Sequence, residues 1–224
     1  MFNAIFSTAK SFFLKASPLL VKFDEQDITE KLSRHGLLKF REIFTHMTPE
    51  ESFALFCTAT SLPNKALVVE IGSYLGSSSC FICSGLPQDA KLVCIDTWEN
   101  HAMRYDDNDV DADPRDTYQE FVKNTEIFSN KITKIRKWSD DAAEDVRAIG
   151  KPINFLFIDG DHHYESVLKD WLLYSPLLDK RAYIAFHDTG WAEGVQRVVA
   201  EYIKPLAKLH ISLPNLQIYT LASR

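Results

Sequence analysis

Short apolar segments rich in β-branched residues recur along the chain and predict the strands of a sheet. Five of these segments span residues 66–71, 91–96, 131–136, 153–159 and 182–187. The segments between them carry apolar residues at helical spacing. Strands that alternate with helices in this way predict an α/β fold with a doubly wound, mostly parallel sheet.

Apolar stripes predict the helices that cover this sheet. A helix is expected over residues 49–60, because Thr48, Pro49 and Glu51 have the spacing of a capping box with proline at the first helical position. Residues 210–213 and 217–222 predict an antiparallel C-terminal hairpin that closes the sheet edge. Two later helical stripes are expected to face the core. They consist of Val167, Leu168, Trp171, Leu172 and Leu178, and of Val195, Val198, Val199, Tyr202 and Ile203.

The predicted elements divide the chain into a helical N-terminal extension, residues 1–62, and one α/β domain, residues 63–224. The extension begins with an amphipathic helix, which lysines interrupt too often for a transmembrane span. It is expected to pack against its own domain or against a second subunit in a homo-oligomer, with a membrane surface as the alternative. Its apolar residues are Phe2, Ile5, Phe6, Ala9, Phe12 and Phe13.

Residues 97–124 interrupt the alternation and predict an acidic lid loop over one end of the sheet. Five aspartates lie between Asp106 and Asp113. A calcium loop that begins at Asp109 places Glu120 at its twelfth position, but Pro114 stands at the sixth, where such a loop needs glycine. A solvated acidic lid is therefore favoured over a calcium site.

Composition narrows the class of protein. The 224 residues are 46% hydrophobic and carry a net charge of −6, from 25 basic and 31 acidic side chains. This content supports a full core and excludes wholesale disorder, and the acidic balance argues against a nucleic-acid partner. The four cysteines are too few to cross-link a chain of this length, which favours the reducing cytoplasm. Cys80 and Cys83 form a C-x-x-C pair, expected to be buried on a helix, with a redox or zinc role as the alternative.

The strongest chemical signal follows the first predicted strand. The sequence EIGSYLGSS, residues 70–78, is a glycine turn that opens a helix, and Asp96 ends the next strand 24 residues after Gly72. Gly72 lets a ligand approach the backbone, and a helix N-terminus offers free N–H groups to a negative group. An acid at this distance is placed to accept hydrogen bonds from ribose hydroxyls.

This turn lacks the G-x-G-x-x-G pattern of nicotinamide enzymes, which weakens that interpretation. It resembles instead the first motif of class I S-adenosylmethionine-dependent methyltransferases, of the catechol O-methyltransferase-like group, over residues 66–189. The resemblance implies a Rossmann-like fold and S-adenosylmethionine as cofactor. The implied cofactor-binding residues are Glu70, Gly72, Ser73, Tyr74, Ser78, Asp96, Thr97, Ser139, Asp140 and Asp159.

Within this set the resemblance implies separate roles. Gly72, Tyr74 and Ser78 surround the amino-acid end of the cofactor, and Asp96 binds the ribose. Ser139 and Asp140 contact the adenine ring. Another interpretation of these two residues, which can hold at the same time, is a helix cap before residues 142–148. Glu70 orients the turn, or is an exposed carboxylate at the strand end.

Two polar clusters end the fourth and fifth predicted strands. They are DGDHHY at residues 159–164 and HDT at residues 187–189. The resemblance implies a divalent metal, magnesium or manganese, on Asp159, His187 and Asp188. The imidazole suits manganese, iron or zinc better than magnesium. A metal-free alternative is that His162 removes the substrate proton while Asp161 or Asp188 orients its ring. The predicted catalytic residues are His162, Asp159 and Asp161.

The same clusters resemble bacterial macrocin O-methyltransferase-like and cephalosporin-hydroxylase-like proteins. That resemblance implies O-methylation of a hydroxyl on a sugar, glycan or small natural product. Trp98, Tyr105 and Trp191 are candidate stacking surfaces for the acceptor, or they fill the underside of the lid. A nicotinamide-dependent oxidoreductase, a non-catalytic cofactor-binding subunit, and transfer to nitrogen or carbon stay as alternatives.

Overall fold

The computed structural model describes residues 25–99 and 116–221. The predicted N-terminal amphipathic helix, Tyr105 and the aspartates of the predicted lid lie outside these residues. Among the residues described, no helix combines the length and the apolar character needed to cross a bilayer.

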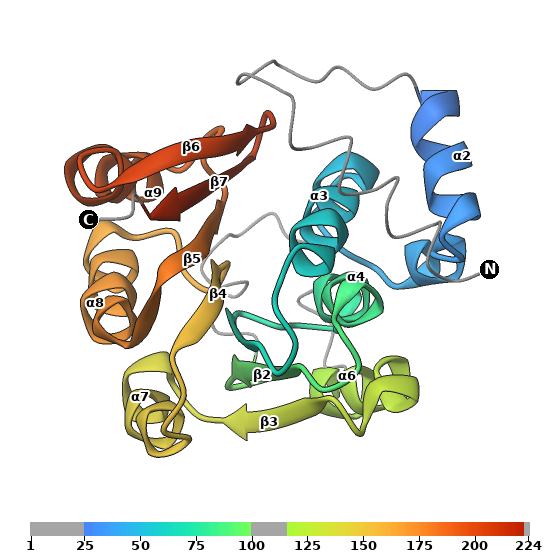
Figure 1. Cartoon of the computed structure of the whole chain (residues 1–224), viewed down its shortest axis with the longest axis horizontal. Helices are drawn as coiled ribbons and strands as arrows, with labels where there is room; N and C mark the ends of the chain where they lie inside the picture. The colour runs from blue at the N-terminus through green and yellow to red at the C-terminus, as the bar shows by residue number, and fades with distance from the viewer. Residues whose placement is uncertain (1–24, 100–115, 222–224) are drawn as a thin grey trace.

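Seven strands form one sheet in the order β3-β2-β1-β4-β5-β7-β6 (Figure 1). The first five strands pair in parallel, and β7 pairs antiparallel with both β5 and β6. The predicted doubly wound sheet and its C-terminal hairpin are therefore confirmed. The strands are β1 (Leu67–Ile71), β2 (Lys91–Asp96), β3 (Ile132–Arg136), β4 (Ile153–Ile158), β5 (Leu178–His187), β6 (Ala207–Ser212) and β7 (Leu216–Leu221).

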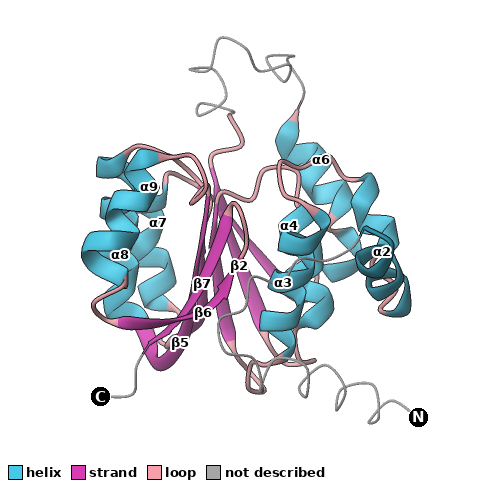
Figure 2. Ribbon diagram, turned by 90° about the horizontal axis from the view of Figure 1, so that it is seen from above, coloured by secondary structure: helices cyan, strands magenta, loops and turns pink. Residues whose placement is uncertain are grey.

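Helices cover both faces of the sheet, as Figure 2 shows. One layer holds α2 (Glu25–Arg34), α3 (Pro49–Thr60), α4 (Ser77–Gly85) and α6 (Thr117–Asn124), and the other holds α7 (Ser139–Ala148), α8 (Tyr164–Tyr174) and α9 (Glu193–Val198). Shorter turns are η1 (Leu38–Glu42), η2 (Glu126–Phe128), η3 (Ser175–Leu177) and the π-helical η4 (Val199–Ile203). Neighbouring strand residues face opposite layers, so Val68 and Val69 belong to separate core clusters.

A third apolar cluster joins α2, η1, α3 and α4. It contains Ile28, Leu32, Phe40, Phe53 and Phe81 among its buried members. Helix α3 also contributes Ala54, Leu55 and Ala59 to the core cluster that contains Val68. Residues 25–62 of the predicted extension thus pack directly on the α/β domain.

Three details differ from the sequence-based expectation. The segment predicted as a loop ends in α6, because Asp116 accepts a hydrogen bond from the Gln119 backbone and Phe121 is fully buried. Leu172 is 55% exposed, since Val167 and Trp171 define the buried face of α8. Leu178 belongs to β5, because Ser175 ends the helix.

All four cysteines are buried and unbridged. Burial raises the pKa of the Cys57 and Cys80 thiols to about 12. Cys80 and Cys83 lie within α4, which confirms that the C-x-x-C pair consists of buried helix residues.

The capping box at the start of α3 gives a testable contribution to stability. Thr48 Oγ1 accepts from the Glu51 backbone N–H at 3.3 Å, and the Glu51 side chain accepts from the Thr48 N–H at 2.8 Å. We expect Thr48→Ala to lower the free energy of unfolding by about 1 kcal/mol, because one helix N–H loses its partner. Urea titration measures this difference, and an unchanged midpoint would contradict it.

Candidate active site

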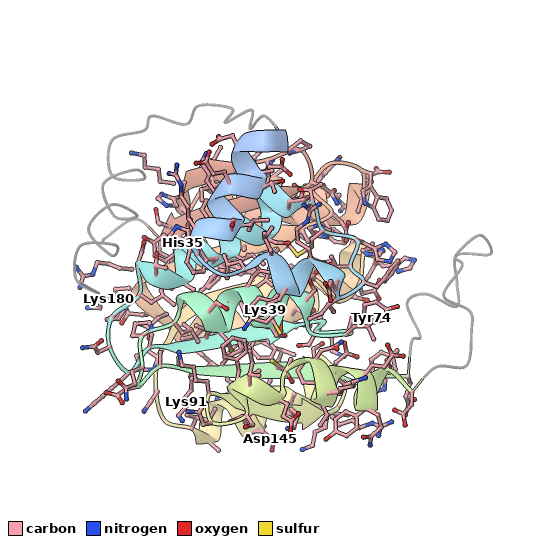
Figure 3. The ribbon with its side chains drawn as sticks, turned by 90° about the vertical axis from the view of Figure 1, so that its right-hand side faces the viewer. His35, Lys39, Tyr74, Lys91, Asp145 and Lys180 are labelled. Carbon is pink, nitrogen blue, oxygen red and sulfur yellow. The ribbon has the colours of Figure 1, made fainter. Side chains whose placement is uncertain are left out.

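The glycine turn after β1 lies at the carboxyl edge of the sheet. Tyr74 of this turn lies at the end of the molecule opposite Lys91 and Lys180, which stand in the amino-terminal parts of β2 and β5 (Figure 3). Gly72 has φ +84°, and a Cβ there would lie 2.2 Å from the Asp159 carbonyl oxygen. The expected room for a ligand beside Gly72 is therefore occupied by the backbone after β4.

Tyr74 is also left-handed, with φ 42°, although it carries a side chain. The Trp98 indole Nε1–H donates to the Tyr74 carbonyl at 2.8 Å and fixes this conformation. The Tyr74 ring meets Phe44 edge-on, with 6.4 Å between centroids. The turn therefore presents an aromatic side chain where a more glycine-rich turn would present none.

The side chain of Asp96, the last residue of β2, binds the backbone of the glycine turn. Its Oδ2 accepts from the Ser73 and Tyr74 N–H groups at 2.9 and 2.8 Å, and its Oδ1 accepts from the Trp98 N–H at 2.7 Å. Burial raises the pKa of Asp96, and these three hydrogen bonds act against that rise. Oδ2 already accepts two hydrogen bonds, so Oδ1 is the oxygen that can accept from a further donor such as a hydroxyl.

Glu70 lies fully buried beneath the turn. Its Oε2 accepts from the hydroxyls of Ser73 and Ser79, and burial raises its pKa above the ordinary value. The alternative of an exposed carboxylate is wrong, because the chain folds α4 over this side chain. Its hydrogen bonds tie the turn to the first residues of that helix.

One cavity of about 920 Å³ opens at the carboxyl ends of the strands. It lies between β1 and β4, where the strand order reverses and α/β sheets bind their ligands. Every predicted cofactor residue except Glu70 lines it, and so do Asp161, His162, His187 and Asp188. The cofactor-type turn and the polar clusters therefore face the same space.

At the far side of this cavity α7 begins at Ser139. Trp138 holds the N-cap position, so the interpretation that Ser139 or Asp140 caps this helix is wrong. The Tyr174 hydroxyl donates to the Ser139 carbonyl at 2.6 Å, and Asp140 forms an ion pair with Lys169. These contacts fix the start of α7 against α8.

His187, at the end of β5, is the centre of a buried charged cluster. Its Nδ1 lies 3.0 Å from Asp159 Oδ1 and 3.2 Å from Asp188 Oδ1. Burial would lower the pKa of this imidazole, but the carboxylates, Asp159 first, raise it to about 12. Burial likewise raises the pKa of Asp159, whereas hydrogen bonds from His162 and His187 outweigh burial and lower that of Asp188.

These three side chains fit a divalent metal. Asp159, His187 and Asp188 each offer one ligand atom, and the atoms lie within 4.8 Å of one another. Two carboxylate oxygens and one imidazole nitrogen favour manganese or another transition metal over magnesium.

His162 lies beside this cluster. Its Nε2 is 2.9 Å from Asp188 Oδ2, and its side chain is 37% exposed. Its ring packs edge-on against the Trp191 ring, with 4.8 Å between the ring centroids. The hydrogen bond to Asp188 raises the pKa of His162, while burial opposes the rise. Asp161 does not orient this ring: it accepts from the backbone N–H groups of His162 and His163 and contacts the His163 ring.

The fold and these strand ends have a match among known families. A family model described as a methyltransferase domain matches residues 69–189, more than half of the chain. The chain belongs to this methyltransferase domain family. The matched span begins within β1 and ends just after Asp188, so it includes both polar clusters.

Solved structures share the fold of this domain. The O-methyltransferase TomG of Streptomyces achromogenes, solved with SAM, has a TM-score of 0.59 and 15% identity over 96% of each chain. An O-methyltransferase of Bacillus cereus, solved with SAH, has a TM-score of 0.60 and 15% identity over 97% of this chain and 100% of that one. The protein y4gI of Sinorhizobium fredii is 27% identical over 127 residues, 54% of this chain but only 13% of that protein.

The prediction that Trp98 offers a stacking surface to the acceptor is wrong. Trp98 is only 5% exposed and packs against Tyr118 and Phe121 of α6, at 5.1 and 4.9 Å between ring centroids. Its indole N–H is committed to the turn, so it is a structural residue. Trp191, in contrast, is 58% exposed and lines the cavity.

Sequence reasoning missed three side chains at this site. Phe44 is 49% exposed and lines the cavity from the segment before α3. Asn215 donates from Nδ2 to Asp188 Oδ1 at 2.9 Å, and Glu51 lies 3.5 Å from His187 Nε2. The capping box and the hairpin turn reveal two of these residues as local structure only, since their contacts with the site join distant parts of the chain.

Proposed function

We propose that the protein transfers a methyl group from S-adenosylmethionine to a hydroxyl oxygen of a sugar, glycan or small natural product. The observation that carries this proposal is that one cavity is lined by the glycine turn with Asp96 and also by the His162–Asp188 pair. Cofactor and acceptor can therefore meet in one space. Since the sulfonium already activates the methyl group, the protein chiefly orients the reactants and removes a proton.

The proton has a defined acceptor in this scheme. His162 Nε2 donates to Asp188, which leaves Nδ1 to accept the proton of the acceptor hydroxyl. The oxygen forms its bond to the methyl carbon as the carbon–sulfur bond breaks, and S-adenosylhomocysteine leaves as the neutral thioether. Asp188 keeps the imidazole oriented and stabilises its positive charge.

A divalent metal is compatible with the same residues. Asp159, His187 and Asp188 would hold it. A bound metal lowers the pKa of a hydroxyl that it coordinates. Asp188 can serve both partners, because Oδ1 faces His187 while Oδ2 faces His162.

Two exposed aromatic side chains support a sugar or natural-product acceptor. Phe44 and Trp191 line the cavity from opposite parts of the chain, and Trp191 lies against His162. Aromatic faces bind apolar ring surfaces of ligands, and Trp191 is fixed because its Nε1 donates to Asp188 Oδ1 at 2.8 Å. A ring-shaped acceptor bound there lies next to the proposed base.

Isothermal titration with S-adenosylmethionine, S-adenosylhomocysteine and NAD tests the cofactor. We expect micromolar binding of the first two compounds by the wild type. We expect Asp96→Ala to abolish this binding, because the carboxylate that accepts from two N–H groups of the turn and from the Trp98 N–H is lost. Binding of NAD alone would replace the methyltransferase reaction with an oxidoreductase.

A further inference from the structure

Glu51 is a buried acid on α3 that the proposed reaction does not use. It is 1% exposed, although it stands in the first turn of a helix, where a glutamate normally reaches solvent. Its two oxygens join three separate elements. Oε2 accepts from the Thr48 N–H at 2.8 Å and lies 3.5 Å from His187 Nε2, while Oε1 accepts from the Asn215 N–H at 3.2 Å.

The burial of this carboxylate exceeds what a capping box needs. A cap requires only the contact with Thr48, which an exposed glutamate supplies at less cost. The buried Glu51 carboxylate therefore makes contacts beyond the cap, with the His187 imidazole and the Asn215 backbone.

The two nitrogens of His187 face different partners. Nδ1 faces Asp159 and Asp188, the other two residues of the candidate metal site, and Nε2 faces Glu51. Asn215 Nδ2 also lies 3.4 Å from Nε2, but it donates to Asp188 Oδ1 at 2.9 Å. Among the described residues, Glu51 is thus the acid that faces Nε2, with 3.5 Å between Oε2 and Nε2.

We propose that Glu51 is a positioning residue that keeps the proton of His187 on Nε2 and so directs Nδ1 to a divalent metal. This inference rests on the metal site included in the proposed function. A histidine ligand commonly donates its second N–H to a carboxylate, which fixes its tautomer and increases its basicity. Here that carboxylate comes from α3, 136 positions before the ligand in the sequence.

Manganese titration of the purified protein tests this role without any assay of activity. We expect Glu51→Gln to weaken Mn²⁺ binding by about 10- to 100-fold, the usual cost of losing such a carboxylate. Glutamine at this position still caps α3, so the helix keeps its start. Thr48→Ala is the matched control: it removes the cap but leaves the Glu51–His187 contact, and we expect unchanged Mn²⁺ affinity.

A double-mutant cycle separates positioning from a general structural effect. In a His187→Asp background the ligand is a carboxylate with no second N–H to orient. We expect Glu51→Gln to leave Mn²⁺ affinity nearly unchanged in that background. Equal losses in both backgrounds would overturn the proposal. If Glu51→Gln does not fold, Glu51→Asp enters the same cycle, because its shorter side chain draws the carboxylate away from His187, and the same outcomes are expected.

The wild-type protein distinguishes failure of this inference from failure of the proposed reaction. If the wild type binds no Mn²⁺, the role of Glu51 is overturned, whereas S-adenosylmethionine titration still decides the cofactor. If Mn²⁺ binds but S-adenosylmethionine does not, the methyl-transfer proposal fails and the cycle still decides the role of Glu51.

Discussion

We expect His162→Ala to lower the methyl-transfer rate by roughly 10²- to 10⁴-fold, the usual contribution of a positioned general base. His162 is the imidazole that Asp188 holds against the cavity, at 2.9 Å through Nε2. Alanine leaves the acceptor hydroxyl without this proton acceptor. The substitution leaves the glycine turn and Asp96 unchanged, so titration should give an S-adenosylmethionine affinity close to that of the wild type. Formation of S-adenosylhomocysteine with an acceptor from a sugar panel measures the rate.

The adjacent histidine supplies the matched control for this prediction. The His163 side chain is 76% exposed, and its ring contacts Asp161 at 2.7 Å rather than Asp188. His163→Ala removes an imidazole of the same size one position away, and we expect its turnover to stay within a few-fold of the wild type. Equal losses in both variants would show that the segment after β4 matters as a whole and would reject His162 as the base.

Gly72→Ala should cause the largest loss of stability among single substitutions at the site. Two costs add at this position. An L-residue at φ +84° is strained by about 1–2 kcal/mol, and a Cβ placed 2.2 Å from the Asp159 carbonyl oxygen forces β1 and β4 apart, at about 1–3 kcal/mol. We expect a total of roughly 2–5 kcal/mol in the free energy of unfolding, measured by urea titration.

Gly150→Ala isolates the conformational part of that cost. Gly150 also has a left-handed φ, +68°, but a Cβ there meets nothing within 4 Å. We expect this variant to lose only about 1–2 kcal/mol. If the two variants are equally destabilised, the close approach of Asp159 to Gly72 contributes nothing, and the packing argument is wrong.

The sheet and much of the cavity follow from local patterns in the sequence. Strands buried on both faces are continuous apolar runs, so β1, β2 and β4 are visible without any knowledge of their partners. Parallel strands end at one edge, which places Asp96 and Asp159 near each other once the fold class is known. For this reason the sequence alone predicts the glycine turn, the acid that ends β2 and the polar residues at the other strand ends.

The remaining features depend on contacts between distant residues. An aromatic residue such as Trp98 is typical of an acceptor-binding surface, but its indole N–H donates to the Tyr74 carbonyl and its ring is buried against α6. Helix α6 itself has only a cap at Asp116 and one buried aromatic residue to signal it. Asp188 rather than Asp161 contacts the His162 ring, because Asp188 follows β5, the strand that pairs with β4, and its Oδ2 lies 2.9 Å from His162 Nε2.

The buried cysteines have a practical consequence for studies of this protein. Thiol-reactive reagents attack the thiolate, so the four buried cysteines, with thiol pKa values above the ordinary range, give a low background of labelling in the folded state. A cysteine introduced at exposed Ile127 would react far faster than any of them. The native chain is therefore already suited to attaching a single fluorophore or spin label, with no need to replace its own cysteines first.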